Sequence, residues 1–374
     1  MPPDVPIWFV AAAVAPSLLI SLAAGFVVRR WAPRWGLVDQ PGERKVHVTA
    51  TPLGGGLAIW LAVIVTFGIG QAALWLIQQG LLPDAWLPEL ARIHREGIQR
   101  QSGALWFLLA AATLLMLVGL ADDRRGLDWK LRLSVQVAVA AVCVLGQGWR
   151  LTLFLDLPAL TAALSVIWIV GLINSFNMLD NMDGLSSGIA TIASLLLAAV
   201  LLTTPAPGTG VPQLFVGGFL LVLAGALLGF LWHNRPTARL FMGDAGSYFV
   251  GFCVAIATLL ATYSGYEGEA QHAVLAPLVV MAVPLYDTIT VIWIRLREGR
   301  SPFQADKNHF SHRLVELGFT KVQGVLTIYL TTLTCGLGAL LLRRVDAIGA
   351  AVILLIVVCI LGLIAILESP RRRS

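Results

Sequence analysis

Apolar runs long enough to cross a bilayer follow one another along almost the whole chain. A helix that crosses the hydrocarbon core needs about 20 residues, and the pattern predicts eleven spans, at 7–28, 53–79, 104–121, 131–148, 159–176, 185–203, 212–231, 246–264, 273–294, 322–342 and 346–367. The first run lacks a basic start and precedes Arg29 and Arg30, which indicates a retained span and not a cleaved signal. We therefore expect an all-α polytopic membrane protein, with residues 1–374 forming one integral domain.

The composition separates this chain from soluble proteins. Its 374 residues are 57% hydrophobic and 13% charged, whereas a soluble domain carries about 25% charged residues. The cysteines lie in apolar runs without a close pair, which argues against a disulfide framework or a zinc site, and we expect buried apolar side chains. They are Cys143, Cys253, Cys335 and Cys359.

Positive charge is distributed unevenly between the two sides of the predicted bundle. With the short acidic N-terminus placed outside, most of the 26 Lys and Arg residues fall on inside segments. Because cytoplasmic loops carry an excess of these residues, we expect the N-terminus outside and the C-terminus in the cytoplasm. The segment 83–101 on the outer side is expected to form a short interfacial helix. The polar motifs then all lie on cytoplasmic loops, at 29–52, 121–130, 174–187, 232–247 and 295–321.

Adjacent acids end the third span, in LVGLADDRRG. Asp122 and Asp123 abut the apolar run, which is costly unless a metal ion or a proton to be transferred balances them. A solvated loop cap is the alternative interpretation.

A second polar stretch, NSFNMLDNMDGLSSG, ends the fifth span. Asn174, Asn177, Asp180 and Asp183 recur every three residues and so share one helix face, and Gly184 allows the chain to break before the sixth span. An interhelical hydrogen-bond network would need only amides. Mixed Asp and Asn oxygens instead suit Mg²⁺ that carries a phosphorylated substrate.

Asp244 lies between glycines in RLFMGDAGSYFVG, at the start of the eighth span. The N–H groups of a helix N-terminus are unpaired and its dipole is positive there, so this turn suits either a phosphate or a metal-binding carboxylate. The turn alone is a weak signal, and its place beside the other acids strengthens it.

Two basic loops are predicted on the same side. Residues 295–318 carry Arg297, Arg300, Lys307, His309, His312 and Arg313, and residues 38–56 carry Arg44, Lys45, His47 and Thr51. An anionic ligand accounts for these cations better than a zinc-binding histidine pair does. Contact with anionic lipid headgroups and plain topology signals are the alternatives.

Taken together, these residues indicate a reaction class. Carboxylates for magnesium, cations for phosphates and a membrane setting point to phosphoryl-type transfer to or from a lipid. An ion-coupled transporter is the alternative from another class, but it would place acids near mid-span and show related halves.

The order RKxH…TPxGG, GLADD, NxxNxxDxxDGL, GDxGS and DxxHxxHRL resembles the polyprenyl-phosphate N-acetylhexosamine-1-phosphate transferase family, of the glycosyltransferase family 4 type, from about Val38 to Leu314. The resemblance implies ten or eleven helices in the plasma (inner) membrane and a cytoplasmic magnesium site, with Mn²⁺ as an alternative ion. It also implies transfer of a sugar 1-phosphate from a UDP-sugar to undecaprenyl phosphate, with release of UMP.

The resemblance further implies partners and a branch of the family. The partners would be a UDP-N-acetylhexosamine, undecaprenyl phosphate and membrane lipid, with no nucleic acid, and a homodimer is compatible with the sequence. The DKNHFSHRL form and the eleventh span favour the GlcNAc-1-phosphate branch, which initiates cell-envelope polysaccharide synthesis. The phospho-MurNAc-pentapeptide transferase of peptidoglycan synthesis is the alternative.

Residue roles follow from matching the motifs position by position. Magnesium would contact Asp244 and Asn177. The catalytic residues would be Asp122, Asp123, Asp180, His309 and His312, with Asp122 deprotonating or positioning the lipid phosphate. The substrate-binding residues would be Lys45, Thr51, Lys130, Asp183, Arg300 and Arg313, with Lys130 on the phosphates and Asp183 on the uracil.

The chain departs from the family pattern at two places. Phe310 and Ser311 separate His309 from His312, whereas many relatives have adjacent histidines. Asn181 stands where a glycine is usual, which changes local backbone freedom or adds a ligand-facing amide.

Overall fold

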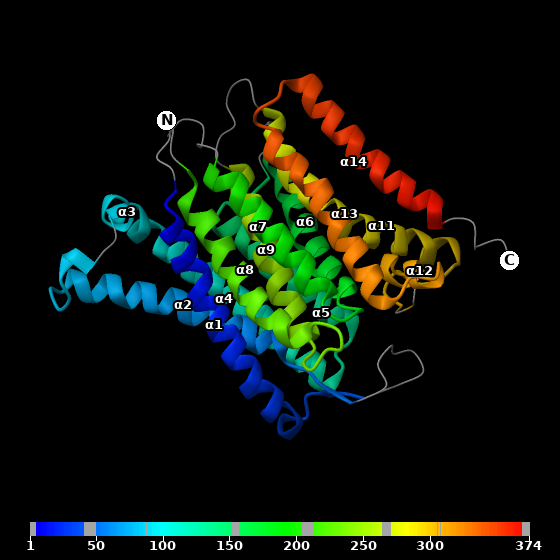
Figure 1. Ribbon diagram of the computed structural model, residues 1–374, viewed down its shortest axis with the longest axis horizontal. Helices are drawn as coiled ribbons and strands as arrows, with labels where there is room; N and C mark the ends of the chain where they lie inside the picture. The colour runs from blue at the N-terminus through cyan, green and yellow to red at the C-terminus, as the bar shows by residue number, and fades with distance from the viewer. Residues whose placement is uncertain are drawn as a thin grey trace.

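The computed structural model describes residues 5–40, 50–86, 89–151, 157–203, 212–263, 271–304, 306 and 308–368, which form a bundle of long helices (Figure 1). Within these residues, ten helices are long and apolar enough to cross a membrane. They are α1 (Ile7–Trp31), α2 (Gly55–Gln78), α4 (Arg95–Arg125), α5 (Trp129–Gly146), α6 (Pro158–Leu179), α7 (Leu185–Thr203), α8 (Leu214–Asn234), α9 (Gly243–Tyr263), α13 (Lys321–Leu341) and α14 (Ala347–Glu368). The predicted all-α polytopic membrane fold is confirmed.

The ninth predicted span is a bent pair of helices and not one straight helix. The 3₁₀ helix η3 (Gln271–Leu275) and α10 (Ala276–Val280) are followed by α11 (Ala282–Arg297) at an angle of 64°. Pro284 lies in the first turn of α11 and has no N–H to donate to the preceding turn, which weakens a continuous helix at this point. Counting this pair as one span gives the eleven spans that the sequence predicts.

Short elements complete the described chain. They are η1 (Ala32–Trp35), η2 (Asp84–Trp86), α3 (Glu89–Ile93), α12 (Phe310–Glu316) and the two-residue strands β1 (Val38–Asp39) and β2 (Thr51–Pro52), which pair antiparallel with Val38 opposite Pro52. The predicted interfacial helix at 83–101 is wrong in its extent, because α4 already begins at Arg95 and continues into the third span. The expectation of buried cysteines is likewise wrong for Cys359, which is exposed on α14.

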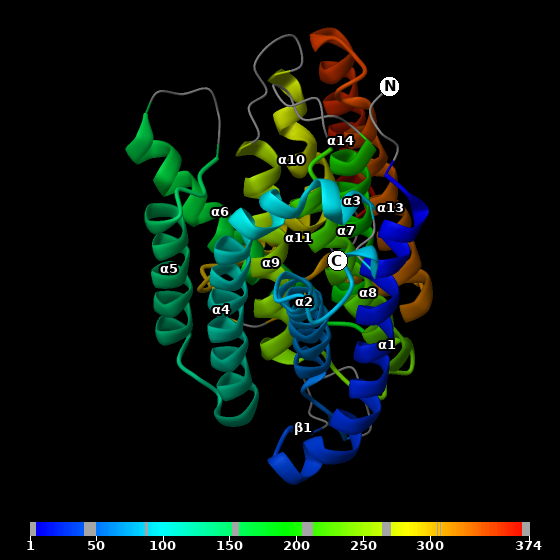
Figure 2. The ribbon, with the colours of Figure 1, turned by 90° about the vertical axis from the view of Figure 1, so that its left-hand side faces the viewer.

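The centre of the bundle is formed by α7, α8 and α9, the most buried of the spans. Figure 2 shows α4 and α5 on one side of this centre and α1 on the other. α1 packs along α8, while α9 is in contact with α2, α4 and α6. The outermost span is α14, and its last turn lies beside α12 (Figure 1).

The start of α9 is joined directly to the start of α2. Phe241 N donates a hydrogen bond to Pro52 O over 2.9 Å, and Gly55 N donates to Phe241 O over 2.8 Å. A Cβ added to Gly56 would lie 2.2 Å from Gly246 N, and one added to Gly119 would lie 2.4 Å from Asp244 O. Glycines therefore allow α2 and α4 to approach the first turn of α9 closely, which brings distant motifs together.

We predict that Gly119→Ala destabilises the protein by about 1–3 kcal/mol, because the new methyl group would press on the backbone of Asp244 and overpack the helix contact. Gly103→Ala in the same helix is the matched control, since a Cβ there meets nothing within 4 Å. Thermal unfolding of both variants in detergent checks this. Equal melting temperatures for the two would contradict the close approach.

Candidate active site

The N-terminus of α9 is the point on which the acidic motifs converge. Asp123, at the end of α4, accepts hydrogen bonds from Asp244 N (2.8 Å) and Ala245 N (3.1 Å). Asp180, which follows α6, accepts one from Gly243 N (3.2 Å). The sequence left open whether this helix start receives a phosphate or a carboxylate, and the structure shows that two carboxylates of the same chain occupy it.

Asp244 and Asn177, the predicted metal ligands, are direct neighbours. Asn177 Nδ2 lies 2.6 Å from Asp244 Oδ1 and 3.0 Å from Ser247 Oγ. Asn174, one turn earlier on α6, instead donates to Gln136 Oε1 on α5 over 2.6 Å. The polar stripe of α6 therefore serves two purposes, because one amide joins the acids while the other holds α5 against α6.

Asp122 is buried and fully engaged by neighbours. Arg132 Nη1 on α5 lies 2.6 Å from its Oδ2, Tyr248 donates to the same oxygen over 3.1 Å, and Leu127 N donates to Oδ1 over 2.7 Å. Arg132 also lies 3.8 Å from Asp244 Oδ2. Its guanidinium is thus a positive charge between two of the predicted site acids, which makes them tolerable without a bound cation.

The turn between α6 and α7 carries the remaining acids. Gly184 adopts a left-handed backbone with φ of 76°, as expected for the break between the two spans. Burial, and next the charge of Asp123, raise the pKa of the Asp180 carboxyl to about 7, and the Gly243 N–H offsets part of this rise. Asp183 Oδ2 accepts from Ala238 N over 3.0 Å, which ties the turn to the segment before α9.

Two of the predicted nucleotide and phosphate contacts, Thr51 and Lys130, lie in parts of the chain that the structure describes. Thr51 is buried in β2, next to the Pro52 that bonds to Phe241. Lys130 is exposed in the first turn of α5, whose N-cap is Asp128. Lys45 lies outside the described residues. The roles predicted for all three stay predictions.

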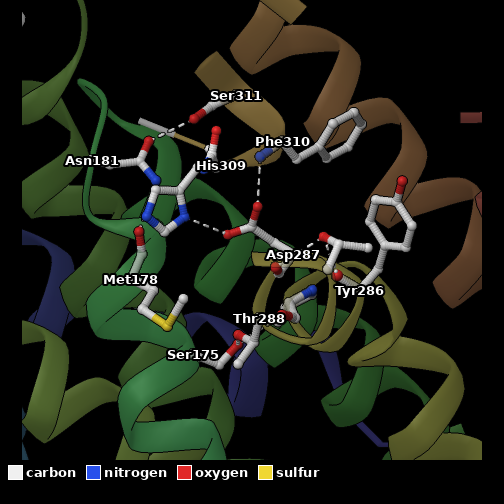
Figure 3. A network of polar contacts seen from close by, with 12 residues as sticks. Ser175, Met178, Asn181, Tyr286, Asp287, Thr288, His309, Phe310 and Ser311 are labelled. Carbon is white, nitrogen blue, oxygen red and sulfur yellow. Dashed lines mark hydrogen bonds and ion pairs between the residues drawn. The ribbon is translucent and has the colours of Figure 1, made fainter. Parts of the chain in front are cut away.

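The loop before α13 approaches the cluster through the histidine motif (Figure 3). His309 is buried, and its Nδ1 lies 2.9 Å from Asp287 Oδ2 on α11. The rings of His309 and His312 are 6.2 Å apart between centroids. Ser311 Oγ donates to Asn181 Oδ1 over 2.6 Å. The two departures from the family pattern therefore meet, because the serine between the two histidines bonds to Asn181, which stands where a glycine is usual.

The arginines of this loop are held by acids of the same chain. Arg295 makes two hydrogen bonds to Asp306, at 2.9 and 3.2 Å, and Arg300 lies 3.4 Å from the same carboxylate. Burial alone would raise the pKa of Asp306, but the hydrogen bonds from Arg295 lower it below its usual range. The predicted cation Arg300 is thus partly neutralised in this conformation.

Arg313 lies deeper than its prediction as a substrate-binding cation suggested. Its Nε is 3.2 Å from Glu368 Oε2 at the end of α14, with side chains only 8% and 6% exposed. Tyr286 on α11 also donates to Glu368 Oε2, over 3.0 Å. Arg313 therefore joins α12 to the last span in this structure.

Four side chains at the site were missed by the sequence interpretation. They are Arg132, Tyr248, Asp287 and Asp306. A signal existed for Asp287, because an acid inside an apolar span indicates function by default. Arg132 was counted only as a topology residue, and Tyr248 stands four residues after Asp244, one helical turn away, where it shares a face with that acid.

The donor set suits magnesium in an open site. Asp244 and Asn177 offer a carboxylate and an amide side by side, and Mg²⁺ takes few protein ligands while keeping waters and substrate oxygens. Among the described residues, no group of three or more His, Cys, Asp or Glu side chains has metal-binding spacing. A closed structural cage is therefore not formed by this part of the chain.

Comparison with known proteins shows which family the chain belongs to. The family model for glycosyl transferase family 4 matches residues 105–262. A probable undecaprenyl-phosphate N-acetylglucosaminyl 1-phosphate transferase of Bacillus subtilis is 30% identical over 359 residues, covering 93% of this chain and 89% of that protein. The chain belongs to the polyprenyl-phosphate N-acetylhexosamine-1-phosphate transferases of glycosyl transferase family 4.

Two further relatives carry related names. A decaprenyl-phosphate N-acetylglucosaminephosphotransferase of Mycobacterium tuberculosis is 33% identical over 95% of this chain and 87% of its own length. An undecaprenyl-phosphate alpha-N-acetylglucosaminyl 1-phosphate transferase of Escherichia coli K12 is 30% identical over 82% of this chain and 76% of its own length. The family resemblance stated from the motifs is confirmed.

We predict that the protein becomes less stable as the pH rises from about 4 to about 7 when divalent cations are chelated. The pKa of an Asp in an unfolded chain is about 3.9, whereas that of Asp180 in the folded protein is raised to about 7. The protonated Asp180 therefore adds its full stabilisation below about pH 3.9, and this stabilisation is lost as the pH rises to about 7. Melting temperatures across this range check it. Asp180→Asn should make the melting temperature less dependent on pH. Asp84→Asn, which changes an exposed aspartate outside the acid cluster, should leave the pH dependence as in wild type. A wild-type slope in Asp180→Asn would contradict the assignment.

We predict that Glu368→Ala lowers the free energy of unfolding by about 3 kcal/mol, because it leaves the Arg313 guanidinium buried without its carboxylate. Glu96→Ala removes the acid of an exposed pair with Arg100 and should cost less than about 0.5 kcal/mol. Denaturant unfolding in detergent measures both values. Similar small losses would show that the Arg313 pair is not buried in the membrane-embedded protein.

Proposed function

We propose that this protein transfers GlcNAc-1-phosphate from UDP-GlcNAc to undecaprenyl phosphate, with release of UMP, as an initiating step of cell-envelope polysaccharide synthesis. The observation that carries the proposal is the convergence of Asp123, Asp180 and Asp244 on the first turn of α9, beside Asn177 and Arg132. This arrangement suits a diphosphate substrate. The names of the relatives favour the GlcNAc branch over the phospho-MurNAc-pentapeptide alternative.

The reaction needs alignment and charge stabilisation more than it needs a protein nucleophile. An oxygen of the lipid phosphate attacks the β-phosphorus of the UDP-sugar, and the bond from that phosphorus to the bridging oxygen breaks as UMP leaves. Both oxygens of Asp122 and both of Asp123 already accept hydrogen bonds, which lowers their nucleophilicity. Direct in-line transfer therefore fits the geometry better than an aspartyl-phosphate intermediate does.

The residues around the cluster divide this work between them. Asp244 and Asn177 would hold Mg²⁺, which when bound neutralises charge on the diphosphate. Arg132 is partly exposed between Asp122 and Asp244 and supplies a fixed positive charge for phosphate oxygens. Lys130, two residues before it in the first turn of α5, is a second cation and is exposed.

The same face is proposed to be cytoplasmic, in the plasma (inner) membrane. Exposed tryptophans with a cation over the ring gather at this end of the bundle. The pairs are Trp31 with Arg34, Trp129 with Lys130, Trp232 with Arg235, and Trp293 with Arg297. Such residues occupy the membrane–water interface, and cations concentrate on the cytoplasmic side. A site at the cytoplasmic ends of the spans can be reached both by a lipid phosphate in the membrane and by a soluble nucleotide-sugar in the cytoplasm.

We predict that purified protein with undecaprenyl phosphate and Mg²⁺ releases UMP from UDP-GlcNAc and not from UDP-MurNAc-pentapeptide. Chelation should abolish release, and Asp244→Asn should lower kcat by about a hundredfold or more, because it weakens the metal ligand and the charge at the start of α9. Asp346→Asn, at an exposed acid in the turn before α14, is the matched control and should keep wild-type kcat. Absence of UMP with every UDP-sugar would refute the proposal.

A further inference from the structure

Asp287 is a buried acid that has no role in the reaction proposed above. It lies within α11 and has no exposed surface. Its Oδ2 is 2.9 Å from His309 Nδ1, and its Oδ1 accepts from Phe310 N over 2.6 Å. Burying a carboxylate in an apolar helix is unfavourable unless it has partners. Both partners belong to the histidine loop, so the acid serves that loop and not the packing of α11.

The contact with Phe310 fixes the backbone of the loop. Phe310 is the first residue of α12, and the N–H groups of a helix start have no partner within the helix. His309 is the N-cap residue, but its side chain makes no capping hydrogen bond. Asp287 therefore caps α12 from another helix, while the His309 side chain is used for a different purpose.

The contact with His309 fixes the side chain. A carboxylate oxygen accepts the hydrogen bond in this contact, so Nδ1 carries the proton, and in this tautomer of the imidazole Nε2 is an acceptor. His309 Nε2 makes no hydrogen bond with the residues that the structure describes. Figure 3 shows the ring between Asp287 on one side and Asn181 and Met178, at the end of α6, on the other.

A second tether holds the loop on the side of the acid cluster. Asn181 receives the hydrogen bond from Ser311 and donates its own Nδ2 to Met178 O over 2.7 Å, so its amide is fixed at both ends. Asn181 directly follows Asp180, which bonds to the first turn of α9. The loop is thus clamped between α11 and the turn that carries the site acids, with His309 in between.

We propose that Asp287 is a positioning residue for the transfer reaction: it holds His309 with the proton on Nδ1, so that Nε2 is presented toward the α6–α7 turn that carries Asp180 and Asp183. This inference rests on the proposed function and extends it. His309 is the group that contacts the substrate, and Asp287 acts only through it. The same carboxylate sets the helix start that carries His309, so ring orientation and loop position are fixed together.

Asp287→Asn tests the inference because it keeps shape and changes one contact. The amide oxygen can still accept from Phe310 N, but the amide NH₂ then donates to His309 Nδ1 and moves the ring proton to Nε2. We expect kcat for UMP release from UDP-GlcNAc to fall about a hundredfold or more, with KM changed less than about threefold. Thr288→Val is the matched control, since it removes the neighbouring hydrogen bond to Ser175 Oγ without touching His309.

Three results would overturn the inference. One is a kcat for Asp287→Asn within about threefold of wild type, and another is an equal loss in Thr288→Val. The third is an additive loss when Asp287→Asn is combined with His309→Gln, because residues that act as a unit lose activity non-additively.

A readout besides activity separates this inference from the proposed function. ¹⁵N-histidine NMR of the detergent-solubilised protein, with the His309 signal identified by its absence in His309→Gln, should show the Nδ1–H tautomer in wild type and Nε2–H in Asp287→Asn. Wild type that shows this tautomer but releases no UMP would refute the proposed function alone. The same tautomer in both proteins would refute the role of Asp287 alone.

Discussion

The first turn of α9 is the constraint on which the rest of the structure depends. Its N–H groups receive Asp123 from α4 and Asp180 from the turn after α6, and its preceding segment is bonded to β2 and to the start of α2. Helix N-termini favour negative charge because of their unpaired donors and their dipole. A single helix start therefore gathers four chain segments, and without it the acids would be separate and costly at a membrane boundary.

Charge balance explains why the cluster is stable before any ligand binds. Asp122, Asp123, Asp180 and Asp183 each accept a hydrogen bond from a backbone N–H group, and Arg132 lies close to Asp122 and Asp244. Burial, and next the charge of Asp123, nevertheless raise the pKa of the Asp180 carboxyl, so its partners do not fully compensate this acid. A cluster of acids that is not fully compensated suits a divalent cation, which is the ion proposed above to carry the substrate phosphates.

The sequence predicted the spans and that several of the acidic motifs lie together, because apolar length and polar interruptions depend directly on the membrane. It also predicted the break at Gly184 and the pairing of Asp244 with Asn177. The sequence did not predict the contacts between distant segments. The sequence alone marks Arg132 only as a cation near a loop, and its contact with Asp122 becomes known from the fold. The bend before Ala282, next to Pro284, was also not predicted. The pairing of Ser311 with Asn181 required the fold, because 130 positions separate them.

The histidine loop is the part of the site with the most external supports. Asp287 on α11 holds its first residues, Asn181 holds Ser311, and Glu368 at the end of α14 holds Arg313. The three supports come from α11, from the turn between α6 and α7, and from α14, the outermost span, which otherwise contributes little to the core. Because α12 has only seven residues, it is too short to be a stable helix alone. Its conformation, and with it the direction of His309, therefore depends on tertiary contacts, which include these three polar ones and the burial of Phe310 and Leu314. Glu368 on the last span is thus one of the residues that hold the histidine loop.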